Sequence, residues 1–166
     1  MNIRACCVVA ATSLAILTAC SNSNTGSSSD GFVGTWSCSG TYALTFTAPA
    51  GTPPYSGTTQ DLDTIVDAGG GVITVQSQND AGAGCTIKAS VSGNTATLQS
   101  AQSCPLSDGL TITYTSGTST LNGSSSYSST YKFTFSGMLT VRFDSGTSVT
   151  VSASGSGTGS SNCTKQ

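Results

Sequence analysis

Apolar and polar residues alternate along most of the chain after residue 31. Tyr42, Leu44 and Phe46 alternate with small or polar residues, and the same pattern recurs in residues 110–115, 130–135, 139–143 and 149–153. Successive side chains of a β-strand point to opposite faces, so the alternation predicts half-buried antiparallel strands. One face of these strands is apolar and the other is rich in Ser and Thr. No segment shows a sustained helical period.

Short runs rich in Gly, Asn and Ser separate the alternating segments and predict turns. They lie at residues 68–71, 79–82, 92–94, 116–117, 122–123, 136–137 and 145–146. The sequence therefore predicts a single all-β domain over residues 32–166, an antiparallel meander of about eight to ten short strands.

One hairpin can be placed in register from the sequence. A two-residue turn at Gly93-Asn94 places the apolar residues of both flanking strands on one face. The predicted pairs are Val91 with Ala96, Ala89 with Leu98, and Cys85 with Gln102. Cys104 lies two residues beyond Gln102 on the same strand face, diagonally across from Cys85, so a Cys85–Cys104 disulfide is within reach.

The cysteines of the domain form an even set: Cys38, Cys85, Cys104 and Cys163. In an exported domain such a set favours two disulfides. If Cys85 pairs with Cys104, then Cys38 pairs with Cys163, which requires the first and last strands to lie close together. The other two pairings remain open. A zinc site is disfavoured because the chain has no His and no Cys-x-x-Cys pair.

The first 19 residues have the features of a signal peptide: a short start with one positive charge, a brief apolar run and small residues at its end. Leu17-Thr18-Ala19-Cys20 resembles the lipobox of bacterial lipoproteins. That resemblance implies cleavage before Cys20, acylation of Cys20 with diacylglyceryl and fatty acyl groups such as palmitate, and contact with membrane lipid. Residues 20–31, a lipidated cysteine and a Ser/Asn/Gly run, are expected to form a flexible tether. The resemblance also implies a lipid-anchored protein of the bacterial cell envelope, with Ser21 favouring the outer membrane.

Gly34-Thr35-Trp36, at the start of the first strand, resembles the Gly-x-Trp motif of lipocalin-like proteins. The resemblance implies an eight-stranded up-and-down barrel, with Trp36 across its narrow end under an arginine from the closing strand. Arg142 is the only arginine after the leader, but it falls in the next-to-last predicted strand. The family's Thr-Asp-x-x-Tyr motif is absent. The alternative is a β-sandwich with Trp36 between its two sheets.

The residues that carry chemistry are few. Without His, the usual base for a Ser or Cys nucleophile is missing, so we expect no enzyme and no cofactor. The net charge of −2 and the absence of a basic cluster argue against nucleic-acid binding. Asp61 and Asp63 share a strand face and could form a carboxylate pair or, together with Asp67, hold Ca²⁺. The alternative, a solvated charge cluster without metal, is preferred.

Two functions from different classes remain. One is a structural or surface-interaction lipoprotein whose partner is an envelope protein or glycan. The other is a barrel that binds a small apolar or amphipathic ligand. Its predicted pocket residues are Tyr42, Phe46, Ile112, Tyr114, Phe133 and Phe135. Aromatic residues at strand spacing most often belong to a core, so the first function is preferred. A connected internal cavity would favour ligand binding, and a filled interior would favour the structural role.

Overall fold

The computed structural model describes residues 29–77, 85–99, 101–106, 109–142 and 148–166. The predicted signal peptide, Cys20 and most of the tether lie outside these residues. The described residues form nine strands: β1 (Gly34–Ala48), β2 (Tyr55–Gly69), β3 (Val72–Ser77), β4 (Thr86–Ser92), β5 (Thr95–Leu98), β6 (Gln102–Pro105), β7 (Leu110–Leu121), β8 (Ser126–Arg142) and β9 (Ser148–Lys165). No helix that is long and apolar enough to span a membrane occurs in these parts of the chain.

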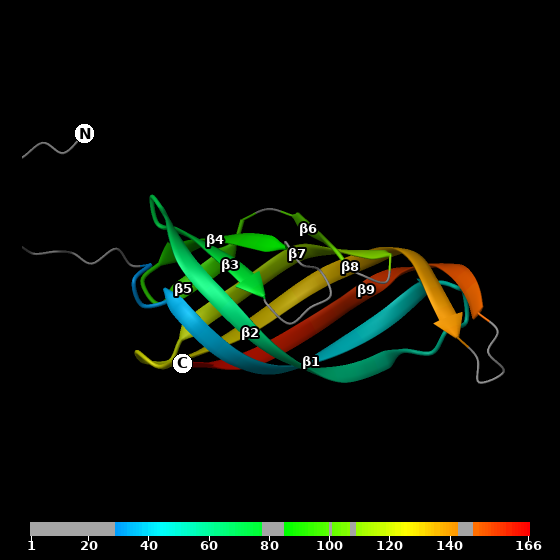
Figure 1. Ribbon diagram of the computed structural model, residues 1–166, viewed down its shortest axis with the longest axis horizontal. Helices are drawn as coiled ribbons and strands as arrows, with labels where there is room; N and C mark the ends of the chain where they lie inside the picture. The colour runs from blue at the N-terminus through cyan, green and yellow to red at the C-terminus, as the bar shows by residue number, and fades with distance from the viewer. Residues whose placement is uncertain (1–28, 78–84, 100, 107–108, 143–147) are drawn as a thin grey trace, which may run out of the picture.

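The strands form one antiparallel sheet that closes into an eight-stranded barrel (Figure 1). The sheet order is β5-β4-β3-β2-β1-β9-β8-β7, and β5 pairs with β7 to complete the circle. The extra strand β6 pairs with residues 111–114 of β7, whereas β5 pairs with residues 118–120. The predicted all-β meander and up-and-down barrel are therefore confirmed, and the sandwich alternative is wrong.

The first and last strands lie side by side, as the lipocalin-like resemblance implies. β1 pairs with β9 along its length, and Cys38 lies directly opposite Cys163. The two residues form a disulfide with Cα atoms 4.0 Å apart, so this predicted bridge is confirmed. Because their sequence separation is 125 residues, the bridge links the two ends of the domain covalently.

The β4–β5 hairpin has the predicted register. Val91 pairs with Ala96 and Ala89 with Leu98, around a turn in which Gly93 has a φ of 57°. The predicted Cys85–Cys104 disulfide is also present. The predicted pairing of Cys85 with Gln102 is wrong. Instead, the Gln102 side chain accepts a hydrogen bond from Lys88 N and donates one to Lys88 O, which takes the place of a backbone pair.

Two of the predicted turns are interior to strands. Ser116-Gly117 lies within β7 at a bulge that follows Tyr114, and Ser136-Gly137 lies within β8. A bulge absorbs one extra residue without ending the strand, so the Ser-Gly signal marks a bend there. The turn at Asn122-Gly123 is confirmed, since it joins β7 to β8 and Gly123 has a φ of 98°.

The β9 strand extends well beyond the predicted segment 149–153. Gly155, Gly157 and Gly159 pair across from three aromatic residues of β8, in the order Phe135, Phe133 and Tyr131. A Cβ atom at any of these glycines would collide with the facing ring. The rings therefore cover the glycine backbone, which gives the strand an apolar inner face without apolar side chains of its own.

One end of the barrel is closed by a buried aromatic cluster. Trp36 and Phe32 are fully buried, and the Trp36 indole N–H donates to Phe32 O at 2.7 Å. Tyr127 packs edge-on against Trp36, with ring centroids 4.8 Å apart, and Leu121 adds an aliphatic contact surface. The expected burial of Trp36 is confirmed.

The cation over Trp36 is Lys165, not Arg142. Lys165 Nζ lies 5.2 Å from the centre of the Trp36 ring. Arg142 pairs with Ser148 at the start of β9, whereas Trp36 pairs with Lys165 at its end. The expected Arg142 contact is wrong because β8 runs antiparallel to β9 and places position 142 at the opposite end of the barrel.

Candidate functional site

The barrel contains a partly open cavity of about 210 Å³ next to the aromatic cluster. Phe32 and Tyr127 line it from the closed end, and the Cys85–Cys104 disulfide lines it farther along the barrel. Much of its wall consists of aliphatic side chains from β2, β3, β4, β5 and β7. These side chains are Ile65, Ile73, Val75, Ile87, Leu98 and Ile112.

The predicted pocket residues divide into two groups. Ile112 and Tyr114 line the cavity, whereas Tyr42, Phe46, Phe133 and Phe135 do not. Phe46 and Phe135 pack against each other with ring centroids 5.2 Å apart, and both Phe133 and Phe135 are buried. Tyr42 borders a separate shallow depression between β1, β2 and β9. This part of the prediction is wrong because Phe133 and Phe135 cover Gly157 and Gly155 of β9, and Tyr42 lies against Gly57 of β2.

The cavity also has a polar side that the sequence analysis only partly anticipated. Asp61 and Asp63 of β2 line it, together with Ser77 of β3, Ser129 of β8 and Ser161 of β9. Alternation along the strand could have indicated that Asp61 and Asp63 point inward, because they share a strand face with the buried Ile65. Serines at inward positions give no such signal, since Ser is also frequent on the outer face of these strands.

Asp67 does not join the other two carboxylates. It lies four residues beyond Asp63, roughly 13 Å along an extended strand. Its side chain is exposed and accepts a hydrogen bond from Gly69 N at the end of β2. The structure therefore does not bring together the three carboxylates considered for Ca²⁺.

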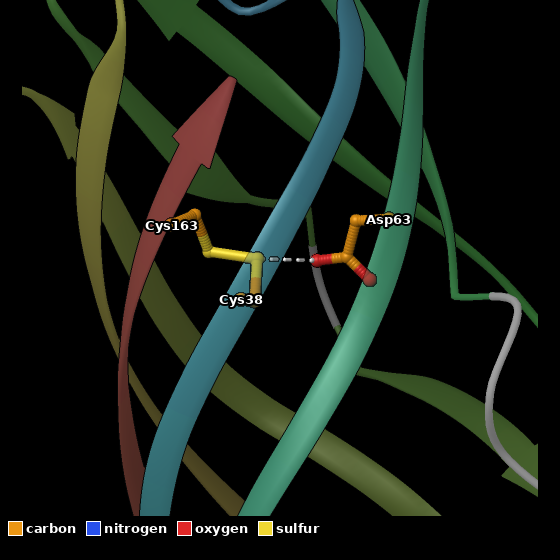
Figure 2. Close-up of side chains that lie close together, drawn as sticks. All are labelled: Cys38, Asp63 and Cys163. Atoms are coloured by element: carbon orange, nitrogen blue, oxygen red, sulfur yellow. Dashed lines mark hydrogen bonds between the residues drawn. A yellow bond between two sulfur atoms is a disulfide. The ribbon is translucent and has the colours of Figure 1, made fainter. Parts of the chain in front are cut away.

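Asp63 contacts the disulfide that closes the barrel (Figure 2). Its Oδ2 lies 3.3 Å from Cys38 Sγ and accepts a hydrogen bond of 3.3 Å from the Tyr127 hydroxyl. Cys38, Cys163 and Asp63 offer ligand atoms within 4.8 Å of one another, a spacing that would suit a metal ion. Both sulfurs are bonded to each other, however, so they provide no thiolate ligand. A disulfide sulfur also carries no proton, so a hydrogen bond between the two groups requires a protonated carboxyl.

The surroundings of Asp63 favour that protonated form. Burial, and after it the nearby Asp61 charge, raises the pKa of the Asp63 carboxyl from 3.8 to about 6. Hydrogen bonding by the Tyr127 and Ser77 hydroxyls lowers the pKa of Asp63. Ser77 pairs across from Asp63, but its buried Oγ forms no hydrogen bond of good geometry among the described residues. Burial also raises the pKa of the Tyr127 hydroxyl, which therefore stays protonated and acts as a donor.

The pKa of Asp63 makes the stability of the protein depend on pH. The folded state binds the proton more tightly than the unfolded chain, so this stabilisation is complete below about pH 4. It is lost as the pH rises through about 6. A shift of this size corresponds to about 2 to 3 kcal/mol. Asp63→Asn does not ionise, so we expect it to raise the free energy of unfolding by about 1 to 3 kcal/mol at pH 7.5 but not at pH 4.

Urea unfolding at pH 4, 5, 6 and 7.5 measures this difference. Asp67→Asn is the matched control, because it removes an exposed carboxylate from the same strand and keeps the amide oxygen that Gly69 N can contact. Parallel pH profiles for the wild type and Asp63→Asn would contradict the prediction.

The arrangement can bind a small molecule. The described side chains at the cavity offer carboxylates, hydroxyls and aliphatic groups, which together can hold a small molecule with an apolar part and a polar part. Compared with known families and curated proteins, the chain matches no family model and no curated relative.

Proposed function

We propose that this protein is a non-catalytic binding protein of the bacterial cell envelope, whose barrel holds a small amphipathic molecule. The observation that carries the proposal is the cavity of about 210 Å³ inside the barrel, with aliphatic walls and a few convergent polar groups. Binding pockets of proteins commonly have this composition. A purely structural barrel of this size would fill its interior with side chains, as the aromatic residues of β8 do farther along.

The cavity volume limits the size of the ligand. An engineered apolar cavity of about 150 Å³ holds one benzene molecule. By proportion, this cavity accepts a molecule of about eight to ten non-hydrogen atoms. At typical ligand efficiencies such a molecule binds with a dissociation constant of about 0.1 to 1 mM, unless strong polar contacts add to the affinity.

Binding of indole tests the cavity directly. Indole has a suitable size, and we expect calorimetry or ligand-observed NMR to detect its binding to the wild type. Ala96→Leu places a larger side chain into the cavity from the buried Ala96 position and should weaken indole binding at least tenfold. The matched control is Thr97→Leu, on the exposed outer face of the same strand. No indole binding by the wild type, or equal binding by Ala96→Leu, would contradict the proposal.

We further propose that an acylated Cys20 anchors this binding domain to a membrane. The support is the lipobox-like Leu17-Thr18-Ala19-Cys20 sequence. Two disulfides in the domain fit the same setting, because disulfides persist in oxidising compartments outside the cytosol. Two or more acyl chains are sufficient for stable membrane attachment.

Replacement of the acylated residue tests the anchor. Cys20→Ala is expected to abolish metabolic labelling with palmitate and to release the protein from the membrane fraction. Cys85→Ala/Cys104→Ala, which removes two cysteines of the domain, is the control and should keep its label. Normal labelling of Cys20→Ala would end the lipoprotein interpretation and leave the binding proposal intact.

A further inference from the structure

The carboxylates of the cavity both come from one strand. Asp61 and Asp63 project from β2, and Ser77 of β3 lies across from Asp63. Ile73, Ile87 and Ile112 line the cavity from β3, β4 and β7. The cavity thus combines two carboxylates from one strand, which we call its carboxylate end, with aliphatic side chains from several strands.

The Asp63 carboxylate has hydroxyl groups beside it but no cation among the described residues of the cavity wall. Both of its close contacts, the Tyr127 hydroxyl and Cys38 Sγ, involve Oδ2. The Ser77 hydroxyl also lies close enough to lower the pKa of this carboxyl, and among the described residues no lysine or arginine lines the cavity. Ser77 Oγ, also at this end, is buried and has no hydrogen-bond partner of good geometry in the described parts of the chain. The Asp63 side chain is half-buried, and a carboxylate withdrawn from water is normally paired with a cation, so a cation is the group that this position lacks among the described residues.

The charged and titratable groups of the cavity wall include no cation among the described residues. The cavity wall contains Asp61 on β2, Tyr114 on β7, and Tyr127 and Tyr131 on β8, and the Cys38 side chain on β1 is held in a disulfide. The lysines of the described strands are exposed instead: Lys88 on β4, Lys132 on β8 and Lys165 on β9. The electrostatic field at the carboxylate end of the cavity is therefore negative.

We propose that the ligand of the barrel is a small apolar molecule that carries one ammonium group. The ammonium lies against Asp63 and Asp61, where its positive charge compensates their negative charge, and the apolar part packs against the aliphatic side chains of the wall. This inference rests on the proposed function, since it names the chemical class of the ligand in the same cavity. A divalent metal ion is a poorer fit, because Ca²⁺ takes six to eight oxygen ligands and most of this wall is aliphatic.

Three probes of similar size and different charge test the inference: benzylammonium, benzyl alcohol and benzoate. At pH 7.5 we expect benzylammonium to bind at least tenfold more tightly than benzyl alcohol, and benzoate to bind least tightly. Benzylammonium stays protonated between pH 5 and 7.5, whereas Asp63 ionises within that range. Its affinity should therefore fall about tenfold from pH 7.5 to pH 5, while the affinity for benzyl alcohol stays within about twofold.

Two variants test whether the preference for benzylammonium depends on Asp63. Asp63→Asn should remove most of the preference for benzylammonium and leave the affinity for benzyl alcohol within about threefold of the wild type. The control, Asp67→Asn, should leave all three affinities unchanged because its side chain is exposed outside the cavity. The pH dependence of the wild type provides a second test that requires no variant to fold.

The outcomes separate this inference from the proposed function. Equal binding of benzylammonium and benzyl alcohol at pH 7.5, or tighter binding of benzoate, overturns the ammonium inference and leaves the binding barrel standing. If benzylammonium is preferred but Asp63→Asn keeps the preference, the assignment to the carboxylate end is overturned. If none of the three probes binds to the wild type, both the inference and the proposed function fail.

Discussion

Replacing both Cys38 and Cys163 with alanine is expected to lower the free energy of unfolding by about 5 kcal/mol. The bond between them closes a loop with a sequence separation of 125 residues, and the entropy that a cross-link removes from the unfolded chain grows with loop length. A loss of this size is a large fraction of the stability of an ordinary domain, about 5 to 15 kcal/mol. Urea unfolding of the double variant under oxidising conditions measures it.

The other disulfide is the natural comparison. Cys85–Cys104 has a sequence separation of only 19 residues. By the same loop-entropy argument, Cys85→Ala/Cys104→Ala should lower the free energy of unfolding by about 3 kcal/mol. Double variants are required, because a single replacement would leave a free thiol able to form new disulfides. A larger loss from the Cys85/Cys104 variant than from the Cys38/Cys163 variant would contradict the loop-length argument.

Trp36→Ala is expected to destabilise the domain by about 3 to 5 kcal/mol, the usual cost of removing a large buried aromatic side chain. Trp36 is fully buried, packs against Tyr127 and donates its indole N–H to Phe32 O. Its loss leaves a cavity at the closed end of the barrel and a backbone carbonyl without its donor. Thermal and urea unfolding give the change in stability.

Trp36→Phe separates packing from hydrogen bonding at this position. The smaller ring keeps much of the contact with Tyr127 but cannot donate to Phe32 O, so we expect a loss of about 1 to 3 kcal/mol. Lys165→Ala is a further comparison, because it removes the cation over the ring and should cost about 1 kcal/mol or less. If Trp36→Ala cost no more than Lys165→Ala, Trp36 would not be central to the closed end.

The strands that could be predicted from sequence carry their own apolar side chains. Residues 130–135 and 139–143 alternate clearly, and the Gly93-Asn94 turn specified its hairpin to the residue. Residues 154–161 of β9 contain no large apolar side chain, so the alternation that marks a strand is absent from that segment. The apolar cover of this strand comes from Tyr131, Phe133 and Phe135 of the neighbouring strand. Analysis of the apolar pattern within a single segment therefore misses a strand whose apolar cover comes from the side chains of a neighbouring strand.

The candidate site was predictable only in part for a related reason. The sequence showed that Asp61 and Asp63 share a face, but the role of that face depends on what lies across the barrel. Ser77 meets Asp63 only through the β2–β3 register, and Tyr127 reaches Asp63 from β8, 64 residues away. The predicted ring-lined pocket failed because Phe133 and Phe135 were interpreted as lining empty space, whereas facing glycines leave room for the rings to pack. The position of an empty volume depends on such pairs of large and small residues on neighbouring strands.

The nested order of the two disulfides makes the timing of oxidation important. Cys38–Cys163 encloses Cys85–Cys104 in the sequence, so pairing in the order of synthesis would join Cys38 to Cys85 and Cys104 to Cys163. Until β9 has been made, Cys38 has no native partner and one edge of β1 stays unpaired. The native bonds therefore require that Cys38 remains reduced until the last strand arrives, or that wrong bonds are exchanged by thiol attack. Correct maturation of this barrel thus depends on the timing of oxidation or on disulfide exchange, in addition to the pairing of its strands.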